Sequence, residues 1–349
     1  VRSWGGERSF GAEIGRLNGS IFGEFDRIDE AVAMKLARLY IHYGFGAEAH
    51  QLLDLLDPAR PGVTTARELA DVVDNVPRPG GTLADALHCG EPAVLWAILA
   101  MPELSQDRVF DHSALKRSFV ALPETLRRSL GPVLVRRLVS AGHARTAKTV
   151  FGLIGENRDR PGAGNAFAKA ALAKSTGEPA EADAALRHVE ERNATQSGAA
   201  LAERLEAALS RAQPVTLEDS QLAGALAFEH RGSPVGDRLA AVYIEALGAS
   251  GAFDKAINEY ARLSPALGDE TGLEVAAKLV EALLTTADDV TFLRHVMTDD
   301  LGSPKALPGS LVLGVADRLL GLDFADEALR YADSQGFGDN DRAARLLRA

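Results

Sequence analysis

The chain has 349 residues, which is long enough for two domains or for one extended repeat array. Its net charge of −11 opposes the backbone of nucleic acids, and no run of Lys or Arg offers a local exception, so we expect no nucleic-acid partner. No stretch approaches the ~18 apolar residues that a membrane span needs, which predicts a soluble chain without membrane insertion. Because 46% of the residues are hydrophobic but only 6% are aromatic, the predicted core is rich in Ala, Leu and Val, which suits closely packed helices.

Residues 1–28 are rich in glycine and carry scattered bulky apolar residues, with no helical stripe until the end of the segment. We interpret the segment as a non-repeating arm or as the remnant of an upstream domain, because the chain begins with Val1 rather than Met. The missing start and the scarcity of cysteine slightly favour a bacterial periplasmic protein over a cytoplasmic one. The single cysteine, Cys89, is interpreted as a small buried hydrophobic residue rather than a nucleophile.

From Asp29, a residue type favoured at helix N-caps, apolar residues recur at helical spacing as far as Gly44. A second stripe follows the short turn and stops before Pro58, so the two helices are predicted to lie antiparallel. The same pattern returns four more times, around Gly142, Gly177, Gly251 and Gly321. Residues 29–349 are therefore predicted to hold five helix pairs of one design, with diverged helical pairs between them.

A small residue recurs in the second helix of each of these pairs, as Ala49, Ala147, Ala182, Ala256 and Ala328. The intervals are close to whole multiples of about 35 residues, the period of helix-pair repeats. Alanine lets two helices approach closely, and glycine supplies a left-handed turn. Since one pair cannot bury its own face, neighbouring pairs must stack, which predicts an all-α solenoid with no substantial β-sheet.

Two runs of the sequence resemble tetratricopeptide repeats: LARLYIHYGFGAEAHQLL, from Leu36, and LAAVYIEALGASGAFDKAINEYARL, from Leu239. Gly251 and Ala256 match the turn and the second helix of that family. The resemblance extends over most of the chain from Asp29, although residues such as Ala37 and Ile244 replace the usual first-helix glycine. It implies a right-handed α-solenoid of antiparallel helix pairs, with protein or peptide ligands lying along the first helix of each pair.

Motifs for catalysis and for cofactor or metal binding are not found. GFGAEA from Gly44 approximates the dinucleotide fingerprint, but that motif follows a strand, whereas a long helix is predicted before Gly44. No two of the eight histidines have the four-residue spacing that sets two metal ligands on one helix face. GFGDND from Gly336 lacks the final glutamate of a calcium loop, and Asp339 or Asn340 is predicted to cap the last helix. We expect no catalytic residue, no cofactor and no metal.

The leading hypothesis is a non-enzymatic scaffold or adaptor that binds a protein or peptide on the concave face of the helical array. The alternative is the non-catalytic helical domain of a larger enzyme whose active domain lies upstream of residue 1. A closed α/α-barrel enzyme would need many aromatic residues for sugar stacking, and the 6% aromatic content argues against it.

The tetratricopeptide register, anchored on the recurring alanines, also predicts a binding face. In that family the concave surface is lined by first-helix positions that correspond here to Arg38, Arg136, Lys174 and Arg238. Four cations on one face would locally invert the field of a protein with net charge −11 and would favour an acidic ligand. In the alternative interpretation they are ordinary solvated or internally paired charges, and only their surroundings decide between the two.

Overall fold

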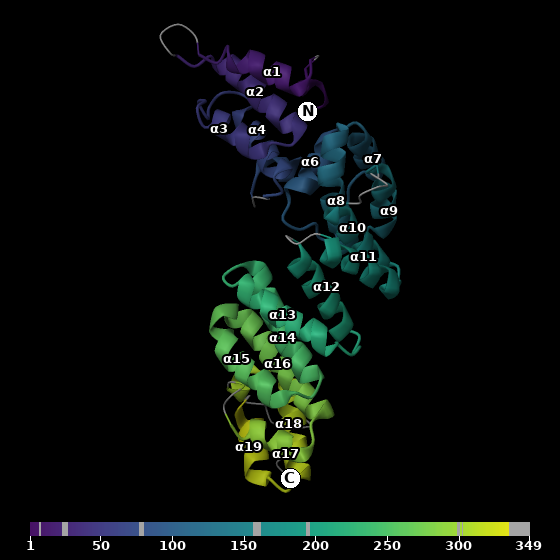
Figure 1. Cartoon of the computed structure of the whole chain (residues 1–349), viewed down its shortest axis with the longest axis vertical. Coiled ribbons are helices and arrows are strands. Elements are labelled where there is room, and N and C mark those ends of the chain that lie inside the picture. The colour runs from purple at the N-terminus through teal and green to yellow at the C-terminus, as the bar shows by residue number, and fades with distance from the viewer. Residues whose placement is uncertain are drawn as a thin grey trace. The chain divides into compact units, whose positions relative to one another are not determined.

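The computed structural model describes residues 1–6, 8–22, 27–76, 80–155, 162–192, 196–298, 301 and 303–334. These residues form α-helices and a few short 3-10 helices, as Figure 1 shows, and their one β feature is an isolated bridge between Phe22 and Ile28. The predicted all-α fold class is confirmed. Among the helices that the structure describes, none combines the length and the apolar composition that a membrane crossing requires.

The chain divides into two compact units, Val1–Ala185 (unit 1) and Leu186–Ala349 (unit 2), and each has its own hydrophobic clusters. The boundary falls inside helix α11 (Pro179–Arg192). Unit 2 carries nearly all of the net charge of −11, whereas unit 1 has nearly equal numbers of acidic and basic residues. The two units therefore present different electrostatic environments to a ligand.

The helices of unit 1 before α11 are α1 (Phe10–Asn18), α2 (Glu30–Tyr43), α3 (Gly46–Leu53), α4 (Val63–Val73), α5 (Thr82–Asp85), α6 (Ala93–Ala100), α7 (His112–Val120), α8 (Glu124–Ser140), α9 (Ala144–Leu153) and α10 (Ala163–Ser175), with the 3-10 helices η1 (Arg2–Trp4) and η3 (Ala86–His88). Those of unit 2 are α12 (Ser197–Leu209), α13 (Leu217–Glu229), α14 (Pro234–Ala249), α15 (Phe253–Leu267), α16 (Asp269–Thr286), α17 (Asp289–Val296), α18 (Gly309–Gly321) and α19 (Ala325–Ser334), with η4 (Pro304–Ala306).

Helix α2 shows how local sequence sets the helix ends. The Asp29 carboxylate accepts hydrogen bonds from the backbone N–H groups of Ala31, at 2.9 Å, and Val32, at 3.1 Å, as an N-cap does. Gly44 ends the helix with φ 91°, a conformation that costs glycine little because it has no Cβ. The predicted bounds of this helix are confirmed.

Three of the other four predicted turn glycines adopt the same left-handed conformation: Gly142 and Gly177 have φ 76°, and Gly251 has φ 80°. The prediction for the last pair is wrong. Gly321 is the final residue of α18, and the left-handed residue of that turn is Asp323, with φ 69°. Aspartate tolerates this region better than most residues with a Cβ, so the turn forms without glycine.

The recurring alanines occupy the tight contacts predicted for them. Ala49, Ala147 and Ala256 are fully buried, and Ala182 and Ala328 are each 2% exposed. At such positions a larger side chain would have to displace a neighbouring helix, because protein interiors are close-packed. The burial that a tight helix contact requires is confirmed at these five residues.

Within each unit the helix pairs pack in chain order. In unit 2, α12 contacts α14, α14 contacts α16 and α16 contacts α18, and each of these first helices also contacts the second helix of its own pair. In unit 1, α2 contacts α4, α4 contacts α6, α6 contacts α8 and α8 contacts α10. Contacts between successive first helices are what stacked helix pairs require. The right-handed solenoid and the tetratricopeptide family remain predictions.

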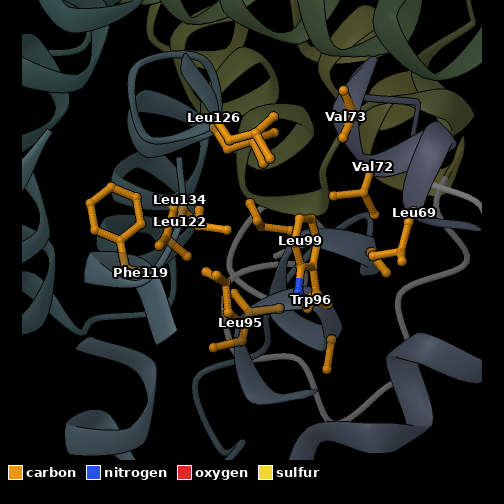
Figure 2. Packing of buried hydrophobic residues seen from close by; sticks show 14 of the residues in the cluster. Leu69, Val72, Val73, Leu95, Trp96, Leu99, Phe119, Leu122, Leu126 and Leu134 are labelled. Carbon is orange, nitrogen blue, oxygen red and sulfur yellow. The ribbon is translucent and has the colours of Figure 1, made fainter. Parts of the chain in front are cut away.

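Helix α6 is the centre of the larger cluster of unit 1. It is apolar on all sides, and every one of its residues after Ala93 is buried, as expected of a helix surrounded by others. Figure 2 shows Trp96 and Leu99 of α6 among side chains of α4, such as Val72, and of α8, such as Leu126. Burial on every side, rather than on one stripe, makes α6 the helix around which this unit packs.

Two expectations about the first part of the chain need correction. Residues 1–28 were expected to lack a helical stripe until their end, but α1 starts at Phe10 and buries Leu17 against Leu36 and Leu39 of α2. Cys89 was expected to be buried and is exposed, after η3. The run GFGDND and its capping residues lie outside the described residues.

Candidate ligand-binding cleft

The four predicted groove cations all lie on first helices. Arg38 is on α2, Arg136 on α8 and Lys174 on α10, and these three belong to unit 1. Arg238 is on α14, in unit 2. The structure therefore separates the set into three cations of one unit and one of the other.

Two of the three cations of unit 1 lie against aromatic rings. The Arg38 guanidinium lies 5.4 Å from the centroid of the Trp4 ring, and that of Arg136 lies 5.4 Å from the centroid of Phe167. Stacking of this kind is typical of arginine and contributes about 0.5–1 kcal/mol at exposed sites. Both guanidinium groups are therefore engaged by an aromatic ring of the same unit.

Arg238 is the one predicted cation that lines a cleft in the described part of unit 2. The cleft, of about 410 Å³, is formed by α12, α14, α16 and the end of α15. Its charged lining residues are Glu206, Asp237, Arg238, Glu245, Glu274 and Lys278, and its apolar lining includes Ala241, Val242, Leu267 and Val275. Four carboxylates face two cations, so the cleft is acidic.

Helix geometry explains how α14 presents its part of this cleft. The helix begins at Pro234, and the hydroxyl of Ser233 accepts a hydrogen bond from the N–H of Gly236 at 3.2 Å. Its lining residues after the first turn are Arg238, Ala241, Val242 and Glu245, which have the spacing i, i+3, i+4 and i+7 of a single helix face.

Helix α16 presents the opposite part with the same spacing. Thr271, Glu274, Val275 and Lys278 also lie at i, i+3, i+4 and i+7. On α14 the apolar residues Ala241 and Val242 lie between Arg238 and Glu245. On α16 the acidic Glu274 and the apolar Val275 lie between Thr271 and Lys278. These two matched stripes are the sequence signal that could have located the cleft, and the sequence analysis did not use it.

Two ion pairs connect the helices that form the cleft. Both carboxylate oxygens of Glu206 on α12 accept hydrogen bonds from Nε and a terminal nitrogen of Arg238 on α14. On the other side, Nζ of Lys278 on α16 donates to Oε1 of Glu245 on α14 at 2.8 Å. Arg238 thus shows the paired charge of the alternative interpretation, because its two-pronged geometry is satisfied within the chain.

The ionisation of the paired groups follows from their surroundings. The hydrogen bond that Arg238 donates to Glu206 is the main reason that the pKa of Arg238 is raised above its ordinary value. Burial raises the pKa of Glu245, because only 10% of that side chain is exposed and water solvates its charge poorly. Lys278 opposes that shift. Asp237 and Glu274 form no ion pair with any residue that the structure describes, and they supply the excess negative charge.

The two glycines of GFGAEA have structural roles. Gly44 makes the left-handed turn, and a Cβ on Gly46 would lie 2.4 Å from the carbonyl oxygen of Ala70 on α4. Real Cβ atoms do not approach a backbone oxygen so closely, so a glycine is needed where α3 starts against α4. Helix α2 precedes the motif, and the nucleotide-binding fingerprint requires a strand there.

No protein-family model, curated protein or solved structure matches this chain. The resemblance to tetratricopeptide repeats therefore depends on the two runs from Leu36 and Leu239 alone.

Proposed function

We propose that the chain is a non-enzymatic protein-binding scaffold and that the cleft of unit 2 binds a partner segment that carries basic side chains. The observation that carries this proposal is the pair of matched stripes on α14 and α16, which put apolar and acidic side chains into one cleft. Helix pairs that stack side by side offer such surfaces without needing any reactive group.

The composition of the cleft suits the side chains of Lys and Arg. Their aliphatic stems cover apolar surface, here that of the exposed Pro234, while their charged ends stay near carboxylates. Asp237 and Glu274 are the carboxylates left to pair with such an end. The large negative charge of unit 2 adds a long-range attraction that raises the rate of association with a cationic partner.

The raised pKa of Glu245 fits a structural role better than a catalytic one. Its carboxylate lies 2.8 Å from the ammonium group of Lys278, so its charge is already held by a cation of the same chain. A general base would instead need to reach the proton of a bound substrate. We interpret the pair as a link that fixes α14 against α16 and so keeps the shape of the cleft.

The proposal is tested by selecting peptides from a random displayed library against the full chain and measuring their affinity by fluorescence anisotropy. We expect the selected peptides to be enriched in Lys and Arg and to bind more weakly as salt rises. The test variant combines Asp237→Asn with Glu274→Lys. It should weaken binding more than tenfold, which corresponds to about 1.4 kcal/mol.

The matched control combines Glu218→Gln with Glu229→Lys on α13. Glu218 lies in the first turn of its helix, as Asp237 does, and both control residues are exposed and outside the cleft. This variant should change the affinity less than about threefold. Peptides without basic enrichment, or binding that survives the cleft variant while its helical circular dichroism is intact, would contradict the proposal.

A further inference from the structure

A second cleft, of about 670 Å³, lies in unit 1, where the last turns of α2 and α7 meet the first turns of α8. Its lining differs from that of the unit 2 cleft in the sign of its charge. The charged or titratable lining residues are Arg2, His42, Lys116, Arg117 and Arg127, and no Asp or Glu is among the described residues that line it.

Most of the arginine and lysine side chains of this cleft form no ion pair with any residue that the structure describes. Arg117 forms an ion pair with Glu91, but Arg2 and Lys116 are exposed and have no ion-pair partner among the residues that the structure describes. Arg127 donates one hydrogen bond to the carbonyl oxygen of Val120, at 2.9 Å, and its Nε is buried without a partner. Three cations of the cleft are therefore uncompensated, in a protein whose net charge is −11.

Packing holds the elements that bring these cations together. Nδ1 of His42 donates a hydrogen bond to the carbonyl oxygen of Val1 at 2.9 Å. The backbone at Gly5 lies so close to α2 that a Cβ there would be 2.4 Å from Nε2 of His42. These contacts fix η1 on α2 and place Arg2 at the cleft.

The sequence carries a signal for this region that the net charge conceals. The stretch from Lys116 to Lys148, which spans α7 to α9, is rich in Lys and Arg and has a single acidic residue, Glu124. Six of its eight basic residues occur as three adjacent pairs, Lys116–Arg117, Arg127–Arg128 and Arg136–Arg137, so no long run of charge marks the region. Folding brings Lys116 and Arg117 of α7 and Arg127 of α8 to one cleft, together with Arg2 of η1.

We propose that this cleft binds an acidic protein segment through its carboxylate side chains. Arginine forks match the two oxygens of a carboxylate, and Val120, Leu122 and Pro123 provide apolar surface for the neighbouring residues of a peptide. A nucleic acid fits less well, because its long polyanionic backbone would be repelled by the net charge of −11 beyond the cleft. The site lies in the other unit from the cleft for basic segments and has the opposite charge.

The probe for this proposal is a fluorescein-labelled dodecapeptide that repeats Gly-Glu-Leu-Glu, titrated with the full chain and followed by fluorescence anisotropy. Companion probes carry Gln, Lys or phosphoserine in place of Glu, and an oligothymidylate provides the nucleic-acid arm. We expect the Glu peptide to bind in a saturable way, and its affinity to fall as the salt concentration rises from about 50 mM to about 500 mM. The Gln and Lys peptides should bind at least tenfold more weakly than the Glu peptide.

The test variant combines Arg2→Glu with Lys116→Glu, which leaves the structural contacts of Arg117 and Arg127 in place. It should weaken binding of the Glu peptide more than tenfold. The matched control combines Arg108→Glu with Arg145→Glu, two exposed cations of unit 1 that do not line the cleft, and should change the affinity less than about threefold. If the double reversal lowers the helical circular dichroism, Arg2→Met with Lys116→Met replaces it.

Equal losses in the test and control variants would overturn the proposal, as would the absence of saturable binding of the Glu peptide by the wild type up to about 1 mM. Tighter binding of the oligothymidylate than of the Glu peptide would assign the cleft to nucleic acid instead. Equal or tighter binding of the phosphoserine peptide would still support the site and would make phosphate its preferred anion. The Asp237→Asn and Glu274→Lys variant should bind the Glu peptide as the wild type does, so the two clefts are tested independently.

Discussion

Arg204 should be among the residues on which the stability of unit 2 depends most. Its guanidinium is 5% exposed and lies between two carboxylates from neighbouring helices, Glu190 of α11 and Asp219 of α13. Glu190 accepts hydrogen bonds from Nε at 2.7 Å and from a terminal nitrogen at 3.0 Å, and Asp219 accepts two more at 2.7 and 3.0 Å. One arginine thus joins three helices.

The change Arg204→Met keeps much of the side-chain volume but removes the charge. Two carboxylates, 14% and 16% exposed, then lose the cation that pairs with both of them. Removing one partner of a buried ion pair costs about 3–5 kcal/mol, because the remaining charge is neither solvated nor neutralised. Replacing all three groups, as in Glu190→Met, Arg204→Met and Asp219→Leu, should cost less than the single change, since it leaves no uncompensated charge.

The loss of unfolding free energy caused by Arg204→Met should become smaller as the pH falls. In the wild type the hydrogen bond from Arg204 is the main reason that the pKa of Asp219 lies below its ordinary value of 3.8. A carboxyl group with a lowered pKa contributes stability above its unfolded pKa and loses it as the pH falls through the folded one. The loss caused by Arg204→Met should therefore be full near pH 7 and should shrink as the pH falls below about 4, where the carboxyl groups become protonated.

The assay is urea unfolding followed by circular dichroism, near pH 7 and near pH 3. The control is Arg262→Met, which removes an exposed arginine that pairs with Glu259 at 2.5 Å within α15, and it should cost less than about 1 kcal/mol. The reasoning would be refuted if Arg204→Met cost less than about 1 kcal/mol near pH 7, or if its cost were the same at both pH values.

Two further predictions concern close helix contacts, and the same unfolding assay measures both. Gly46→Ala should destabilise unit 1 by about 1–3 kcal/mol, because the new Cβ would meet the carbonyl oxygen of Ala70. The control Gly152→Ala, in a helical position with open space around it, should be neutral or stabilising by up to about 1 kcal/mol. Equal effects of the two changes would show that the close approach of α3 to α4 is absent. Ala256→Leu should overpack a fully buried position of unit 2 and lower its free energy of unfolding by about 1–3 kcal/mol. The control Ala225→Leu, at an exposed position of α13, should change it little. An unchanged urea midpoint for Ala256→Leu would mean that Ala256 does not lie at a tight helix contact.

Half-buried arginines make a type of contact that the sequence did not predict. A terminal nitrogen of Arg137, on α8, donates to the carbonyl oxygens of Ile98, at 2.8 Å, and Leu99, at 2.5 Å, near the end of α6. Arg318 on α18 does the same at the end of α16, where it donates to the carbonyl oxygen of Leu283 at 2.8 Å. The final carbonyl groups of a helix lack partners within it, so these arginines satisfy them and are engaged within the chain.

The sequence by itself determined the features that depend on residues a few positions apart. Helical spacing predicted the all-α class, Asp29 and Gly44 predicted both ends of α2, and the recurring alanines predicted buried contacts such as that of Ala256. Each of these follows from a local rule, because a cap, a turn or a helix face involves one or two turns of backbone. The same kind of local reasoning failed at Gly321, since Asp323 could make the turn instead.

Only the tertiary structure decided where the charges lie. The sequence left open whether Arg238 is a free groove cation or an internally paired charge; its partner Glu206 is 32 residues away, and Glu245 and Lys278 are 33 residues apart. These separations are close to one helix-pair repeat of about 35 residues, so such partners meet only when successive first helices stack. An ion pair between helices depends on which faces touch and at what height, and neither is set by the local sequence. That is why the sequence predicted helices such as α2 and α14 but not the sign of the charge in the cleft that α14 lines.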